Sequence, residues 1–117
     1  MKVLLVDDEE ELVTTLAERL GFRGIEAKWT TAGDDAMALT EKEPFDVVVL
    51  DVKMPHLNGI QLKKKLERIR PEMKFVFLTG HGSEEDFRVG SAEADHYLVK
   101  PLDIEALVAT LREVFGS

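Results

Sequence analysis

The stretch VVVLDVKMPHLNG, Val47 to Gly59, decides the fold. Its first four residues are apolar without interruption, which is typical of a strand buried on both faces of a parallel sheet. The strand runs directly into the carboxyl group of Asp51 and then into a turn that contains a lysine and a proline. Burying an isolated carboxylate is costly unless it is paired, hydrogen-bonded or bound to a cation. We therefore expect such a partner beside Asp51.

Length, composition and charge exclude several classes of protein. A chain of 117 residues fits one compact domain, residues 1–117, and can bury a core without cross-links. The absence of cysteine excludes disulfides, thiolate metal sites and thiol nucleophiles. The net charge of -8 argues against direct nucleic-acid binding, which relies on Lys and Arg. Because the apolar runs are too short for a membrane span or a signal peptide, we expect a soluble, cytoplasmic protein.

Apolar segments of two kinds alternate along the chain. Short runs rich in Val, Leu and Phe predict strands. These runs lie at Val3 to Val6, around Ala27 and Trp29, at Val47 to Leu50, at Phe75 to Leu78 and at Tyr97 to Val99. Apolar residues at helical spacing lie between them, most clearly from Leu12 to Leu20 and from Ile104 to Leu111. The alternation indicates an α/β fold in which helices cover both faces of a five-stranded parallel sheet.

Glycine and proline predict where the helices end. Gly21 and Gly24 are expected to close the first helix, and Pro44 to stop the second. Pro71 separates the third helix from the strand that follows it. These breaks define short connections within one domain, because no Pro/Gly/Ser-rich linker divides the chain.

Polar residues follow four of the five predicted strands. They are Asp7 and Asp8 after the first strand, Asp51 after the third, Thr79 after the fourth and Lys100 after the fifth. In an open parallel sheet, ligands bind outside the carboxyl ends of the strands, where the strand order reverses. If the first and third strands are neighbours, three carboxylates converge there and either take up protons or bind a cation. Oxygen ligands without Cys or a His pair suit Mg²⁺.

The same residues have the composition of a phosphoryl-transfer site. Carboxylates, a divalent ion, a lysine and a hydroxyl together position and neutralise a transferring phosphoryl group. Asp51 is then the nucleophile that forms an acyl phosphate, and Lys100 supplies a second positive charge. The cation and the incoming phosphoryl group are thus the expected partners of Asp51.

Four motifs in order resemble the receiver domain of two-component response regulators, a CheY-like family. The motifs are KVLLVDDEE (2–10), DVKMPHLNG (51–59), FVFLTGHGS (75–83) and HYLVKP (96–101), and the resemblance extends over essentially the whole chain. It implies a flavodoxin-like, doubly wound (βα)5 three-layer sandwich with strand order 2-1-3-4-5. It also implies a phosphorylation-dependent signalling switch that does not turn over an external substrate.

The resemblance assigns roles to individual residues at the acidic end of the site. Asp51 accepts a phosphoryl group from a sensor histidine kinase or a phosphotransfer protein. Asp8 ligates Mg²⁺ directly, Asp7 helps directly or through water, and the Lys53 backbone carbonyl completes the protein's share of the ligands. Asp51 also belongs to this metal site.

Further roles follow for the residues at the last two strands. The resemblance implies that Thr79 hydrogen-bonds the phosphoryl oxygens, that Lys100 pairs with one of them, and that Tyr97 turns inward on activation. The bond between Lys100 and Pro101 is a candidate cis peptide, because the cis form costs little before proline and the turn must direct the lysine back to the site.

The family also implies partners. We expect an output domain or a target protein, and a possible homodimer through the surface formed by the fourth helix, fifth strand and fifth helix. The chain ends soon after its last helix, at Ser117, so it is either a stand-alone receiver or part of a longer protein.

Two departures from the family pattern affect the mechanism. Lys53 and His81 stand where the family tunes hydrolysis of the acyl phosphate, and these bulky groups favour slow hydrolysis. Between Ser83 and Tyr97 the chain is one residue shorter than the usual receiver. We therefore expect a short, displaced or irregular fourth helix, and Gly90 in its middle supports this expectation.

Two other functions remain open from the residues alone. One is a phosphatase or hydrolase with an aspartyl nucleophile, although haloacid-dehalogenase-like enzymes carry Asp-x-Asp where this chain has Lys53. The other is an interaction module that signals without phosphate. Failure of Asp51 to form a phosphoryl adduct would favour the interaction module.

Overall fold

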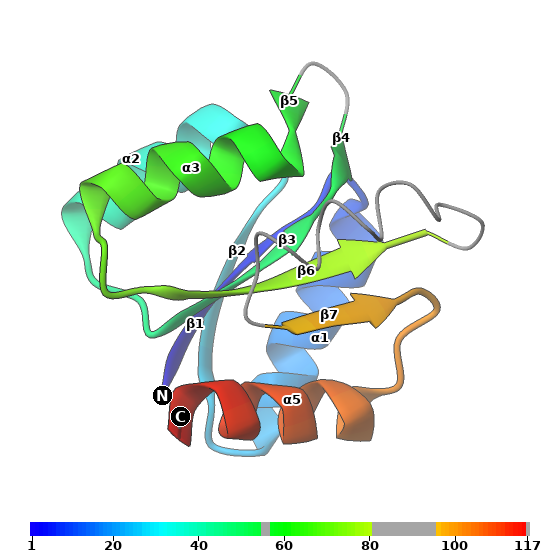
Figure 1. Ribbon diagram of the computed structural model, residues 1–117. Coiled ribbons are helices and arrows are strands. Elements are labelled where there is room, and N and C mark those ends of the chain that lie inside the picture. Colours follow the sequence, from blue (N-terminus) through cyan, green and yellow to red (C-terminus); the bar gives the residue numbers. More distant parts are fainter. Residues whose placement is uncertain (55–56, 81–95, 117) are drawn as a thin grey trace.

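A five-stranded parallel sheet forms the centre of the protein (Figure 1). The computed structural model describes residues 1–54, 57–80 and 96–116. The sheet strands are β1 (Lys2–Val6), β2 (Glu26–Thr30), β3 (Val47–Asp51), β6 (Lys74–Thr79) and β7 (His96–Val99). Their order is β2-β1-β3-β6-β7. Numbered among themselves, these strands have the predicted order 2-1-3-4-5, and the predicted fold class is confirmed.

Helices cover both faces of this sheet (Figure 1). Two helices, α1 (Glu10–Phe22) and α5 (Ile104–Gly116), pack on one face. The other face carries α2 (Gly33–Lys42) and α3 (Gly59–Ile69). The predicted fourth helix falls at residues 81–95, which lie outside the described residues. The described elements form the expected three layers.

Side-chain alternation along the central strands divides the core into two halves. In β1, Val3 and Leu5 belong to the cluster under α1 and α5, whereas Leu4 and Val6 belong to the cluster under α2 and α3. The central strands β3 and β6 alternate in the same way. Each fully buried aliphatic side chain of this kind stabilises the fold by about 1.5–3 kcal/mol. The uninterrupted apolar runs are therefore a consequence of burial on both faces of the sheet.

The first helix ends later than the sequence suggested. α1 continues through Gly21 to Phe22 and is followed by the cap residue Arg23, so the expected closure is confirmed at Gly24 and was wrong at Gly21. The chain turns at Gly24, whose φ of 77° lies in the left-handed region that glycine adopts without strain. The Gly24 amide donates to the Gly21 carbonyl over 3.1 Å. The expected stop before Pro44 is confirmed, because α2 ends at Lys42.

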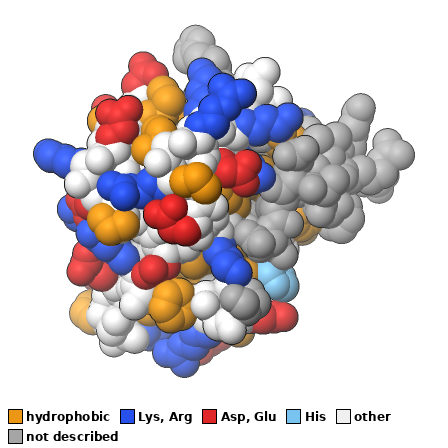
Figure 2. Space-filling model, turned by 60° about the vertical axis from the view of Figure 1, so that its left-hand side comes forward, with side chains coloured by type: hydrophobic (Ala, Val, Ile, Leu, Met, Phe, Trp, Pro, Cys, Tyr) orange, Lys and Arg blue, Asp and Glu red, His pale blue; other side chains and the backbone are white. Residues whose placement is uncertain are grey.

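The surface mixes charges of both signs. On the face shown in Figure 2, Lys and Arg side chains are interspersed with Asp and Glu side chains. Within residues 1–54, 57–80 and 96–116, no helix has the length and apolar character needed to cross a membrane.

Candidate functional site

The acidic residue that follows the central strand is buried. Asp51 is the last residue of β3 and is 5% exposed. The Lys53 amide donates a hydrogen bond of 3.2 Å to its Oδ1. Beyond Asp51, the chain forms a small antiparallel hairpin of β4 (Lys53–Met54) and β5 (Leu57–Asn58) before it enters α3. The sequence had predicted only a turn here, because two-residue strands have no detectable alternation.

The start of α3 is fixed against the backbone of Asp51. A Cβ atom added to Gly59 would lie 2.1 Å from the Asp51 carbonyl oxygen, so this position accepts only glycine without rearrangement. The Gly59 amide donates to the Val52 carbonyl over 2.8 Å. Asn58 caps the helix, since its side-chain oxygen accepts from the Ile60 amide over 2.8 Å. No role was predicted for Asn58 or Gly59, although asparagine directly before a helical run is a helix-start signal.

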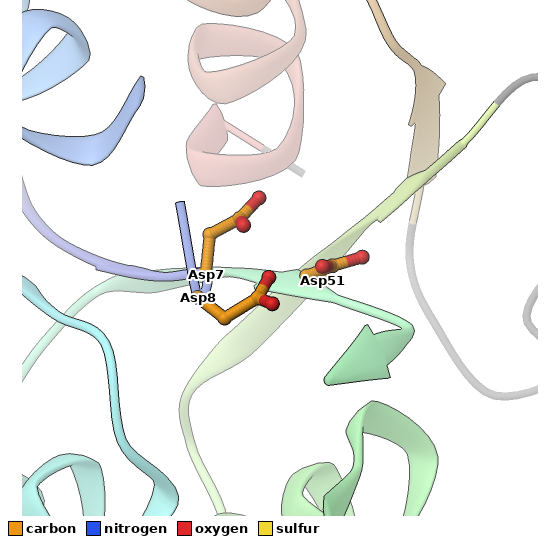
Figure 3. Close-up of side chains that lie close together, drawn as sticks. All are labelled: Asp7, Asp8 and Asp51. Carbon is orange, nitrogen blue, oxygen red and sulfur yellow. The ribbon is translucent and has the colours of Figure 1, made fainter. Parts of the chain in front are cut away.

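Two more carboxylates reach Asp51 from the neighbouring strand. β1 pairs with β3 so that Val6 lies opposite Leu50, which places Asp7 beside Asp51. Figure 3 shows the carboxyl groups of Asp7, Asp8 and Asp51 extending to the same side of the sheet edge. One carboxylate oxygen from each residue lies within 4.8 Å of the others. Asp7 is fully buried, whereas Asp8 is exposed. The structure thus brings together the three carboxylates that the sequence expected to converge.

Lys100 provides the positive charge in this cluster. Its Nζ lies 2.7 Å from Asp7 Oδ2 and 3.6 Å from Asp51 Oδ2. Its backbone amide donates to the Thr79 carbonyl over 2.8 Å, and its bond to Pro101 is cis, as expected. A third carboxylate, Glu9, lies 3.3 Å from the same Nζ. Glu9 was not predicted to belong to the site, although the run DDEE at residues 7–10 places a third acidic group directly after the pair.

Charge in this cluster is unbalanced, and the pKa values reflect it. Burial raises the pKa of Asp51 to about 6, and the charge of Asp7 adds to the effect while Lys100 opposes it. Burial also raises the pKa of Asp7, against the hydrogen bond from Lys100. Burial alone would lower the pKa of Lys100, but its hydrogen bond to Asp7 and the nearby carboxylates raise it. One ammonium group therefore does not offset the carboxylates around it.

The two remaining predicted site residues lie on the adjacent strands. Thr79 is the last residue of β6, buried at the same sheet edge as Asp51. Tyr97 lies in β7 opposite Phe77, half-buried against the cluster under α2 and α3. His81 falls outside the described residues.

The donor set fits a magnesium ion. Asp7, Asp8 and Asp51 offer carboxylate oxygens close enough together to share one cation. Mg²⁺ prefers oxygen ligands, is commonly held by one or two carboxylates and retains several waters. Exposed Asp8 leaves room for such waters. Burial first and the charge of Asp7 second raise the pKa of Asp51, and a divalent charge would offset both by favouring the ionised carboxylate. The arrangement can hold a divalent cation and, with Lys100, neutralise a phosphoryl group.

Curated relatives of similar sequence are response regulators. The transcriptional regulatory protein CpxR of Klebsiella pneumoniae is 39% identical over 114 residues, which are 97% of this chain and 48% of that protein. Response regulator MprA of Mycobacterium leprae is 32% identical over 113 residues, 96% of this chain and 50% of that protein. The chain therefore spans about half the length of the curated relatives it matches.

Solved structures agree with these relatives. A CheY-like response regulator receiver domain protein of Methanospirillum hungatei has a TM-score of 0.89 at 29% identity, covering 98% of this chain and 93% of that one. Chemotaxis protein CheY4 of Vibrio cholerae has a TM-score of 0.88 at 33% identity, covering 97% of both chains. The family described as the response regulator receiver domain matches residues 3–112. The chain therefore belongs to the response regulator receiver domain family, the phosphoacceptor switches of two-component signalling.

Proposed function

We propose that Asp51 is the phosphoacceptor of this switch and that a sensor histidine kinase or a phosphotransfer protein supplies the phosphoryl group. One observation carries the proposal: Asp51 is a buried carboxylate at the carboxyl edge of the sheet, 3.6 Å from the Lys100 ammonium and beside two further carboxylates. Structural carboxylates are rarely buried among like charges. A reacting phosphoryl group and its counter-ion account for this arrangement.

The reaction is a displacement at phosphorus. A carboxylate oxygen of Asp51 attacks the phosphorus atom of a phosphohistidine, a P–O bond forms, and the P–N bond breaks. The electron pair of that bond remains on the imidazole nitrogen. The Lys53 amide holds Asp51 Oδ1, which leaves Oδ2 on the side of Lys100. The domain thus assists its own phosphorylation and later dephosphorylation by water, and it turns over no external substrate.

Asp7, Asp8, Asp51 and the Lys53 backbone carbonyl are the groups that would hold Mg²⁺. When bound, the ion neutralises the carboxylates and the charge on the phosphoryl oxygens. Lys100 adds a second positive charge, and its short contact to Asp7 keeps the ammonium at the reacting carboxylate. The Thr79 hydroxyl donates to a phosphoryl oxygen.

Phosphorylation then shifts a conformational equilibrium. The added charge and acceptor oxygens favour the state in which Thr79 and Tyr97 satisfy them. The ratio of the two conformations changes only to the extent that phosphorylation stabilises one of them more than the other. The output is an attached domain or a separate protein in the cytoplasm, reached by protein contact rather than through nucleic acid. A homodimer through the surface of the fourth helix, β7 and α5 belongs to the same proposal.

The lifetime of the phosphoryl group depends on Lys53. Its side chain is exposed next to Asp51, where it can hinder the attacking water. Comparison of the acyl phosphate half-life in the wild type and Lys53→Asn tests this role. A shorter half-life in the variant is expected, and equal half-lives would remove Lys53 from the account.

Intact-mass spectrometry after incubation with acetyl phosphate tests the proposed acceptor. The wild type should gain one phosphoryl adduct in the presence of Mg²⁺ and none in EDTA. Asp51→Asn should gain none under either condition. Asp34→Asn, the same chemical change on an exposed position of α2, is the matched control and should behave as the wild type. An adduct that persists in Asp51→Asn, or its absence from the wild type, contradicts the proposal.

A further inference from the structure

Glu9 occupies the N-cap position of α1 but does not cap the helix. Its backbone is extended, with φ of -87° and ψ of 95°, and its side chain accepts no hydrogen bond from the first turn. Ser, Thr, Asp and Asn are the residues that serve well at this position, because their short side chains reach the free amides. The carboxylate of Glu9 lies instead 3.3 Å from Lys100 Nζ.

The backbone of Glu9 is also tied to the site. Its amide donates a hydrogen bond of 3.0 Å to Asp7 Oδ1, while the other oxygen of Asp7 faces Lys100 at 2.7 Å. Glu9 is therefore held at its backbone through Asp7 and at its side chain through Lys100. This geometry fixes the carboxylate at the ammonium without any help from helix capping.

The three carboxylates around Lys100 differ in exposure. Asp7 and Asp51 are buried, with 0% and 6% of their side chains exposed, whereas the Glu9 side chain is 61% exposed. The Lys100 side chain is 17% exposed. Glu9 thus approaches the ammonium from the solvent side. Its contact to Nζ is shorter than that of Asp51, at 3.3 Å against 3.6 Å.

We propose that Glu9 is a positioning residue that holds Lys100 toward α1 and competes for it with the phosphoryl group on Asp51. Transfer of a phosphoryl group places new anionic oxygens on the Asp51 side of the ammonium. Lys100 can pair fully with those oxygens only by weakening its contact to Glu9. The negative charge of Glu9 therefore opposes formation of the phosphorylated state. This inference rests on the proposed function and concerns the strength of the switch rather than its chemistry.

The test compares two variants that remove the same charge. Glu9→Gln keeps the shape of the side chain and loses the charge that attracts Lys100. Glu10→Gln makes the identical change at the first residue of α1 and serves as the matched control. Two quantities are measured with Mg²⁺ at saturation: the dissociation constant of beryllofluoride, followed by amide NMR, and the rate constant for Asp51 phosphorylation by acetyl phosphate. Thermal unfolding of each variant reports whether the fold is kept.

Glu9→Gln is expected to bind beryllofluoride about two- to fivefold more tightly and to be phosphorylated faster by a similar factor, as for the loss of one partly exposed ion pair. Glu10→Gln is expected to match the wild type in both quantities. Equal values for the two variants would overturn the competition between Glu9 and the phosphoryl group, and so would weaker binding in Glu9→Gln. Either of these two outcomes would leave the proposal that Asp51 is phosphorylated unaffected. Failure of the wild type to be phosphorylated would instead contradict the proposed function itself.

Discussion

The two ends of the parallel sheet carry ionic clusters of opposite character. At the amino end, Lys2 lies between Glu26 and Glu43, and Lys28 pairs with Glu43 as well. At the carboxyl end, one ammonium group, that of Lys100, faces three carboxylates, two of which are buried. The first cluster alternates positive and negative groups near solvent. The second collects like charges in the protein interior.

The pKa shifts at the two ends show what this difference does to stability. Hydrogen bonds from Lys2 and then Lys28 hold the pKa of Glu43 below its usual value, so the charged form is favoured in the folded protein. Burial and the charge of Asp7 shift the pKa of Asp51 in the other direction. The ionised Glu43 therefore stabilises the fold, whereas the ionised Asp51 destabilises it, and the site around Asp51 is suited to bind a cation and a phosphoryl group.

Removal of one lysine at each end is expected to give the largest difference in stability between the two clusters. Lys100→Met leaves the buried Asp7 carboxylate without its 2.7 Å ion pair and should lower the free energy of unfolding by about 2–4 kcal/mol at pH 7 in EDTA. Lys28→Met removes a half-exposed lysine at the amino end and should cost far less. Urea unfolding of both variants measures the difference. Equal losses would mean that burial does not distinguish the two clusters.

Neutralising Asp51 should stabilise the protein. The pKa of Asp51 rises from 3.8 to about 6 on folding, so the folded state binds the proton more tightly and ionisation lowers stability. This cost is absent below about pH 4 and complete above about pH 7. Asp51→Asn should therefore raise the free energy of unfolding by about 1–3 kcal/mol at pH 7 in EDTA and by almost nothing near pH 3. Asp46 directly precedes β3, and its side chain accepts a hydrogen bond from the Lys2 amide at the amino end. Asp46→Asn is the control, and a comparable gain there would refute the explanation.

Magnesium should offset the destabilisation caused by the ionised carboxylates of this site. If Asp7, Asp8 and Asp51 hold the ion, Mg²⁺ at about five times its dissociation constant stabilises the folded protein by about 1 kcal/mol. Differential scanning fluorimetry of the wild type with and without Mg²⁺ measures the effect. Asp8→Asn should reduce it, and Asp34→Asn should not. An equal Mg²⁺ response in Asp8→Asn would place the ion elsewhere.

The smallest effect is expected at the amino end. Because the pKa of Glu43 is lowered on folding, its contribution to stability is present above about pH 4.5 and is lost as the pH falls through the lowered value. Glu43→Gln should lower the melting temperature slightly at pH 7, and this difference should shrink as the pH falls below about 4.5. High salt should reduce the difference, because Lys28 and Glu26 of this cluster are largely exposed to solvent. A stabilising Glu43→Gln would reverse the assignment of the two ends.

The fold and most of the candidate site were predictable because they depend on local patterns. Burial on both faces required the apolar runs of β1, β3 and β6, and those runs place Asp7, Asp51 and Thr79 at one edge once the strands are parallel. The roles of Asp51 and Lys100 in phosphoryl transfer remain predictions that the geometry supports.

Features that depend on contacts between distant residues were missed. Glu9 resembles any acidic residue of a first helical turn until Lys100, 91 positions later, is placed against it. The error at Gly21 is of another kind, because glycine lowers helix propensity without forbidding the helix, and α1 continues through Gly21 to Phe22.

The contact of Gly59 with the Asp51 carbonyl also has a consequence for sequence variation. In a library with every amino acid at residue 59, the smallest substitution, Gly59→Ala, already brings its methyl group to 2.1 Å from that oxygen. The loss of fitness at this position should therefore not depend on the size of the new side chain, and alanine should be selected against as strongly as leucine. Asn58, one residue earlier, has an exposed side chain whose oxygen caps α3, so Ser, Thr and Asp should survive there. Adjacent positions in the same turn would then show opposite tolerance in a deep mutational scan.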